Sequence, residues 1–142
     1  MKAFEIAALT ALLIQLYKGL LAWARRGRPN FRRFVETGGM PSSHSAAVAA
    51  LTTTVAMTDG VMSSLFGVTL FFSLIVMYDA AGLRRAAGRQ AALLNRIMAE
   101  REHRLEAEHQ LFESLGHTPL QVLVGAVLGV FAAIVWNHWF EL

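Results

Sequence analysis

Four apolar stretches separated by polar segments dominate the pattern of the chain. They run from about Ala3 to Ala24, Ser45 to Thr58, Val61 to Tyr78 and Leu120 to Phe140. A helix needs roughly 20 apolar residues to cross a bilayer, so the fourth stretch is long enough and the third is near the lower limit. The second is short unless it begins within residues 38–44, and the first contains Gln15 and Lys18, which are costly in hydrocarbon. The pattern predicts about four transmembrane helices.

The polar breaks predict how these helices connect. Asp59-Gly60 is the only break between the second and third stretches, and it is typical of a tight turn between antiparallel helices. From about Leu83 to Leu115, apolar residues recur at near-helical spacing among many charges. This pattern predicts an amphipathic helix lying on the membrane surface. We expect one domain over residues 1–142.

Composition supports the membrane assignment. Hydrophobic residues make up 55% of the chain and charged residues only 16%, and the mean hydropathy is +0.44. The chain has no cysteine, which excludes a disulfide framework and a thiolate metal site. The net charge of +3 does not indicate a nucleic-acid partner, because the arginines flank apolar stretches. We therefore expect an all-α integral membrane protein in contact with membrane lipids.

The charge distribution predicts an orientation. Eleven of the 13 Lys and Arg residues fall in the two segments that follow the first and third apolar stretches, and only Lys2 and Lys18 do not. These two segments lie on one side of the membrane, and positive residues favour the cytoplasmic side. The sequence therefore predicts that this side is cytoplasmic.

Residues 38–47, GGMPSSHSAA, have the features of a helix start. Pro41 cannot continue a helix from upstream, and Ser42 or Ser43 can cap the free N–H groups of the first turn. A helix start attracts anions, and His44 adds a group that can donate a proton near neutral pH. The simpler interpretation is that this is an ordinary cap of a membrane helix.

Other charged or titratable residues share a position at the cytoplasmic end of an apolar stretch. With His44, they are Lys18, Arg25, Asp79, Arg84, Arg85 and His117. Each has a structural explanation when taken alone: Lys18 can extend to the interface, and Asp79 can pair with a neighbouring arginine. Because all lie on one side, we expect them to meet, and such a group of histidines, cations and helix starts fits a phosphate.

Three motifs resemble those of the type 2 phosphatidic acid phosphatase superfamily, which also contains the vanadium haloperoxidases. Met40-Pro41-Ser42-Ser43-His44-Ser45 is similar to its Pro-Ser-Gly-His motif. Gly116-His117-Thr118-Pro119-Leu120-Gln121-Val122, followed by Gly125, is similar to its His-x-x-x-Asp-Val-x-x-Gly motif. Lys18, six intervening residues and Arg25 resemble Lys-x6-Arg-Pro. With residues 78–85 and 88–90, the pattern is similar to the divergent bacterial and plastid branch over nearly the whole chain.

The resemblance implies hydrolysis of a phosphomonoester without a metal or other cofactor. His117 would attack phosphorus to form a phosphohistidine, and His44 would protonate the leaving oxygen. The phosphoryl oxygens would be held by the remaining candidates, which are Lys18, Arg25, Ser42, Ser43, Arg84 and Arg85.

The sequence departs from the superfamily pattern at several positions. Gln121 stands in place of the Asp that orients the nucleophilic histidine, and Asp79 is the obvious substitute. Leu111 stands in place of an Arg, so Arg84 or Arg85 must supply that charge. Arg26 follows Arg25 where the motif has Pro, and Ser43 stands where the motif has Gly. Most relatives also have six membrane helices, against about four predicted here.

A cytoplasmic site implies a lipid phosphate of the inner leaflet, such as phosphatidylglycerophosphate or phosphatidate. The expected location is a bacterial inner membrane or a plastid-type membrane. The alternative is a non-catalytic protein that binds lipid phosphate or acts as a scaffold and retains the anion pocket, which Gln121 favours.

Two further features leave alternatives open. Glu100 with His103, and Glu106 with His109, have a spacing used in di-metal helix bundles. A solvated, salt-bridged helix face explains the same spacing, and we predict no metal. Gly125-x-x-x-Gly129 permits close helix packing within one chain or in a homodimer. A transporter is a poor candidate because the chain contains no visible repeat.

Overall fold

The computed structural model describes residues 3–26, 39–100, 111, 113 and 115–140. The described residues form helices and no strands, which confirms the predicted all-α class. The helices are α1 (Ala3–Arg26), α2 (Ser43–Thr58), α3 (Ser64–Ala81), α4 (Leu83–Glu100) and α5 (Pro119–Phe140).

Three helical segments in the described residues are long and apolar enough to cross a membrane. They are Ala3–Ala24 in α1, Ser64–Ala99 across α3 and α4, and Pro119–Trp139 in α5. The apolar helix α2 has 16 residues, which gives it a length of about 24 Å at the helical rise per residue. It is therefore shorter than the hydrocarbon core, which is roughly 30 Å thick.

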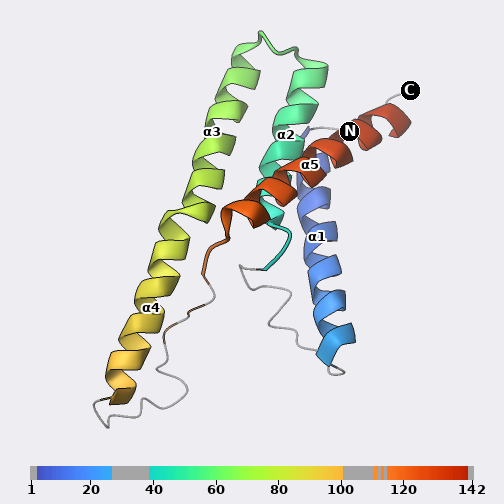
Figure 1. Cartoon of the computed structure of the whole chain (residues 1–142). Helices are drawn as coiled ribbons and strands as arrows, with labels where there is room; N and C mark the ends of the chain where they lie inside the picture. Colours follow the sequence, from blue (N-terminus) through green and yellow to red (C-terminus); the bar gives the residue numbers. More distant parts are fainter. Residues whose placement is uncertain (1–2, 27–38, 101–110, 112, 114, 141–142) are drawn as a thin grey trace.

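Helix α2 occupies the centre of the molecule and packs against α1, α3 and α5 (Figure 1). It forms an antiparallel hairpin with α3, as the Asp59-Gly60 break predicts. Gly60 adopts a positive φ of 86° in the connection. The Ser63 hydroxyl then accepts a hydrogen bond from the N–H of Phe66 at 3.1 Å. Because Ser63 caps the helix, α3 begins at Ser64 and not near Val61.

Small residues let α2 and α5 pack with their backbones in contact. A Cβ atom on Gly125 would lie 3.2 Å from the carbonyl carbon of Ser42, and one on Gly129 would lie 2.8 Å from the carbonyl carbon of Ala46. The two glycines are therefore used inside the protomer. This α2–α5 seam continues at every fourth residue on both helices, through Ala50 beside Ala133 and Thr54 beside Asn137.

The register of the seam makes α2 and α5 run in the same direction. The N–H of Ser42, at the start of α2, donates to the carbonyl of Gln121 in the first turn of α5 at 3.2 Å. At the other end, the Asn137 amide donates to the Thr54 hydroxyl at 3.3 Å. Both helices therefore begin at the same end of the bundle, where their N–H groups and positive dipole ends come together.

Helix α4 continues roughly along the axis of α3 (Figure 1). It is amphipathic, as expected from the sequence, but the predicted helix through Leu115 is too long. The described residues Leu111, Glu113 and Leu115 are not helical. The amide of Asn95 on α4 exchanges two hydrogen bonds with the backbone of Leu111. The chain at this point therefore runs beside α4 toward the start of α5.

Candidate active site

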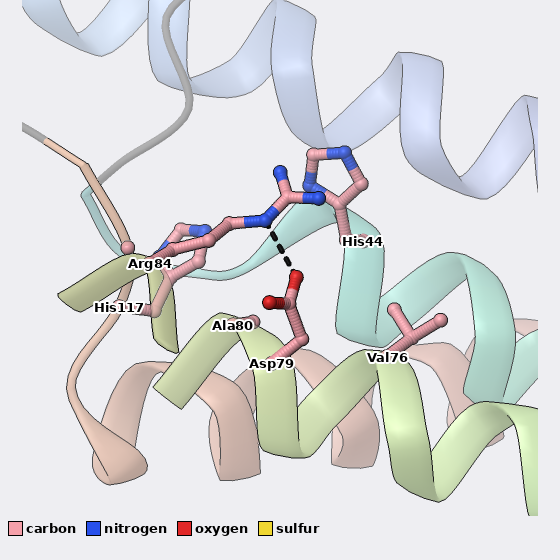
Figure 2. A pocket seen from close by; sticks show the side chains of 7 residues that line it. His44, Val76, Asp79, Ala80, Arg84 and His117 are labelled. Carbon is pink, nitrogen blue, oxygen red and sulfur yellow. Dashed lines mark hydrogen bonds and ion pairs between the residues drawn. The ribbon is translucent and has the colours of Figure 1, made fainter. Parts of the chain in front are cut away.

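A small pocket opens where α2 and α5 begin and α3 ends (Figure 2). Its volume is about 20 Å³, which is room for about one water molecule. It brings together four of the residues singled out in the sequence, which come from four different helix ends. The pocket is lined by His44, Val76, Asp79, Ala80, Arg84, Gly116 and His117.

His117 is held at the junction of α3, α4 and α5. Its backbone N–H donates to the carbonyl of Ala80, in the last turn of α3, at 2.9 Å. The preceding Gly116 has a φ of 80°, and a Cβ atom there would lie 2.7 Å from the Cα of Arg85. Only glycine fits this conformation and this close approach. His117 is 4% exposed.

The surroundings of His117 favour its neutral form. Burial lowers the pKa of the imidazole below its usual value of 6.5, and the positive charge of Lys18 lowers it further. The Gln121 side chain and the Gly39 backbone act in the opposite direction. Nδ1 of His117 is buried and has no hydrogen-bond partner among the described residues. These surroundings favour the neutral ring, which is the form that can act as a nucleophile.

His44 lies in the first turn of α2, and the turn is fixed by the serine that precedes it. The Ser42 hydroxyl accepts hydrogen bonds from the N–H of Ser45 at 3.3 Å and from the Ser45 hydroxyl at 2.9 Å. Ser42 is fully buried as the N-cap of α2, and neither Ser42 nor Ser43 lines the pocket. The exposed His44 side chain reaches the pocket from this turn.

Arg84 and Asp79 form an ion pair at the pocket. Nε of Arg84 donates to Oδ2 of Asp79 at 2.6 Å, and the side chains are 48% and 30% exposed. Figure 2 shows the Arg84 side chain extending from the side of His117 toward His44. Asp79 is thus engaged with Arg84, and no hydrogen bond joins it to His117 among the described residues.

The other expected cations lie around the pocket and not in its wall. Lys18 on α1 is partly buried and donates to Oε1 of Gln15 at 3.4 Å, and its charge reaches His117. The Arg85 backbone packs against Gly116. The side chains of Arg25 and of the Glu–His pairs within residues 100–109 lie outside the described part of the chain. Within that part, no group of three His, Asp or Glu residues could hold a metal ion.

Gln121 has a structural role that the sequence analysis missed. Its Oε1 accepts from the N–H of Thr118 at 2.9 Å, and its N–H donates to the Thr118 hydroxyl at 3.3 Å. This reciprocal pair is a capping box, and its signal is the spacing Thr118-Pro119-Leu120-Gln121 with Pro at the first helical position. Gln121 therefore fixes the helix start that carries His117.

Asn95 was also missed, because a polar residue on a charged helix face gives no sequence signal. Its Nδ2 donates to the Leu111 carbonyl at 2.9 Å and to Oε1 of Glu113 at 2.8 Å. The Leu111 N–H donates back to Oδ1 at 3.0 Å. A Cβ atom on Gly88 would lie 2.7 Å from the carbonyl oxygen of Glu113. Helix α4 thus holds the segment that leads to His117.

Comparison with known proteins gives a family and one relative. The profile of the Divergent PAP2 family matches residues 1–132. An uncharacterized membrane protein of Bacillus subtilis (strain 168), YuiD, is 41% identical over 116 residues, and the match covers 73% of each chain. No solved structure matches the chain.

Proposed function

The chain belongs to the Divergent PAP2 family, and on this basis we propose that it hydrolyses the phosphomonoester of a membrane lipid. The family relates this membrane protein to phosphatases. Beyond that relationship, we propose a lipid phosphomonoester as the substrate, His117 as the nucleophile and His44 as the proton donor.

The observation that carries the proposal is the meeting of His44, Arg84 and His117 in one pocket. Two imidazoles supply a nucleophile and a proton donor, and the guanidinium supplies a charge that matches a phosphoryl group. The starts of α2 and α5 add two positive dipole ends on the same side. These features support chemistry on a phosphate more than on an uncharged group.

In the proposed reaction, a ring nitrogen of His117 attacks phosphorus and the ester P–O bond breaks. His44, as an imidazolium, gives its proton to the leaving alkoxide. Water then attacks the phosphohistidine, the N–P bond breaks, and neutral His44 accepts the proton of that water. Phosphate leaves and both histidines are restored. Arg84 and Lys18 stabilise the charge on the phosphoryl oxygens during both displacements.

The position of the pocket supports a lipid substrate of the cytoplasmic leaflet. The pocket lies at the end of the bundle from which the arginine-rich helix α4 extends, and such segments favour the cytoplasmic side. A lipid with a terminal phosphate, of the phosphatidylglycerophosphate or phosphatidate type, would present its monoester at this depth.

The test is phosphate release by the purified protein in detergent with EDTA, against a panel of lipid phosphates. We expect turnover by the wild type and none by His117→Ala. Turnover that survives in His117→Ala would overturn the proposed nucleophile. Turnover that disappears in EDTA and returns with added metal would overturn the metal-free mechanism.

A second function is favoured by the engagement of Asp79 with Arg84 and by the role of Gln121 in helix capping. Neither residue orients Nδ1 of His117 through a hydrogen bond among the described residues. A protein that binds lipid phosphate without cleaving it would retain the pocket in this form. Binding of vanadate by the wild type without turnover of any lipid in the panel would support this alternative.

A further inference from the structure

A second, larger hollow lies between α1 and α5 on the membrane-facing side of the bundle. Its volume is about 750 Å³, which is within the range of roughly 300–1,000 Å³ that is typical of ligand sites. The side chains that line it are apolar apart from the hydroxyl of one tyrosine. The helices contribute Leu13, Tyr17, Leu21, Val124 and Leu128 among others. We refer to this hollow as the α1–α5 groove.

The groove arises because α1 and α5 each pack against α2 and contact one another much less. Leu13 and Tyr17 are 53% and 55% exposed, and Leu128 is 40% exposed. These side chains therefore line a recess in the membrane-facing surface. Apolar side chains are exposed on α3 as well.

The groove and the pocket share one short segment of chain. Met40 and Pro41 line the groove, and they are followed at once by the cap of α2 and by His44 in the pocket. Gly39, on the other side of Met40, has its backbone against the His117 ring. Residues 40–44 thus contribute to the walls of both cavities.

The positive charge of Lys18 lies close to both cavities. Tyr17 lines the groove, and Lys18 follows it on α1. The positive charge of Lys18 acts on His117, and its Cε would lie 3.8 Å from a Cβ atom on Gly39. An apolar recess that ends beside a cation is complementary to an amphiphile with an anionic head and a hydrocarbon tail.

We propose that the α1–α5 groove binds one hydrocarbon chain of the lipid whose phosphate enters the pocket. The inference rests on the proposed function, because it takes the pocket as the site of the phosphate. It assigns specificity to a surface outside the reacting groups: the chain in the groove positions the monoester between His44 and His117. A short soluble phosphomonoester lacks this contact and binds more weakly.

The first experiment maps the chain directly on the wild-type protein in phosphatidylcholine nanodiscs. The probe is phosphatidate with a diazirine at the middle of one acyl chain, and the comparator is phosphatidylcholine with the same chain. After irradiation, we expect the phosphatidate to label peptides containing Leu13, Tyr17 or Leu128. Unlabelled phosphatidate should compete. Labelling confined to α3, or equal labelling by phosphatidylcholine, would overturn the inference.

The second experiment fills the groove. Leu128→Trp places a large side chain in it, and Val127→Trp is the matched control on the exposed, non-lining face of α5. We expect Leu128→Trp to raise KM for long-chain phosphatidate by at least about tenfold, because excluding two buried methylenes costs about that factor. Hydrolysis of a soluble phosphomonoester should not change. An equal rise in KM with Val127→Trp would overturn the inference.

The two experiments separate this inference from the proposed function. Labelling of the groove by phosphatidate without phosphate release would retain the groove and overturn hydrolysis. Phosphate release with labelling outside the groove would retain hydrolysis and overturn the groove. If Leu128→Trp fails to fold, the labelling of the wild type still decides the matter.

Discussion

Nε of Arg84 lies 2.6 Å from Oδ2 of Asp79, so a carboxylate already occupies the guanidinium that the sequence assigns to a phosphoryl group. The pocket beside this pair has room for about one water molecule. A phosphoryl group is larger, so the pocket must widen to admit it. The ion pair uses only Nε of Arg84, so the other N–H groups of the guanidinium can donate to phosphate while Asp79 stays in place. Asp79 and the anion then share the positive charge of Arg84.

Asp79→Asn should tighten the binding of vanadate. The pair is partly exposed, so we expect a gain of about 0.2–1 kcal/mol, which corresponds to about 1.5- to 5-fold in Kd. Isothermal titration in detergent measures it. Asp59→Asn, at the opposite end of α2, is the control and should leave Kd unchanged. If vanadate affinity is unaltered but turnover is lost, Asp79 orients His117 and does not share the charge of Arg84 with the anion.

Arg84→Gln and Arg85→Gln should differ strongly although the residues are adjacent. Arg84 lines the pocket, whereas Arg85 contacts Gly116 through its backbone. Removing Arg84 should lower kcat/KM by roughly 100-fold or more, as expected for loss of a group that stabilises transition-state charge. Removing the Arg85 side chain should change it by no more than about twofold. Initial rates on a lipid phosphate test this, and equal losses would contradict the structure.

The acid limb of the pH profile should lie below the usual histidine range. Burial and Lys18 lower the pKa of His117, and only the neutral ring is nucleophilic. In kcat/KM, which reports the free enzyme, activity should therefore rise with pH around a midpoint below 6.5 and fall again where His44 loses the proton that it donates. Lys18→Met removes a positive charge that disfavours the imidazolium, so the midpoint should move to higher pH. A midpoint unchanged in Lys18→Met would show that this charge does not act on His117.

Asn95→Ala should lower turnover although Asn95 lies outside the pocket. Its amide makes three hydrogen bonds to residues 111 and 113, which precede His117. Loss of these bonds lets the nucleophile shift, and misplacement by about 1 Å can cost roughly 100-fold. We expect a fall in kcat with little change in the thermal unfolding midpoint. Gln90→Ala, at an exposed position on α4, is the control. Equal effects of the two variants would exclude a positioning role.

Gly129→Ala should destabilise the protein, because the added Cβ would lie 2.8 Å from the carbonyl carbon of Ala46. Overpacking of this kind costs about 1–3 kcal/mol. Gly67→Ala in α3 is the matched control, because nothing lies within 4 Å of its Cβ position. There, the higher helix propensity of alanine should leave stability unchanged or slightly raised. Thermal unfolding in detergent measures both, and equal midpoints would contradict the α2–α5 seam.

Most of the fold could be predicted because hydrophobic stretches mark its helices and because capping and turn residues mark where they begin and end. The apolar stretch from Ser45 to Thr58 predicts the bounds of α2 to within two residues, and Pro41 and Ser42 mark where the helix starts. The helix expected through Leu115 was too long, because the pairing of Leu111 with Asn95 is a contact between residues 16 positions apart. Near-helical spacing of apolar residues carries no information on such contacts.

The site could be predicted only as a set of residues. The sequence placed His44, Asp79, Arg84 and His117 on one side of the membrane, and the structure brings them to one pocket. The sequence left open which partner Asp79 takes, because both Arg84 and His117 are compatible with its position. Side-chain pairing depends on the angle and register between helices, which are set by the α2–α5 seam and have no local signal.

At Gly129, the α2–α5 seam tolerates no other residue without a change in backbone position. The two backbones are in contact there because glycine has no side chain, so every substitution adds atoms and pushes the two helices apart. That position lies about 15 Å along α5 from the helix start that follows His117. A methyl group added in the middle of the bilayer would thus spread the two helix starts at its edge. The seam therefore sets how far apart the helix starts next to His44 and His117 lie.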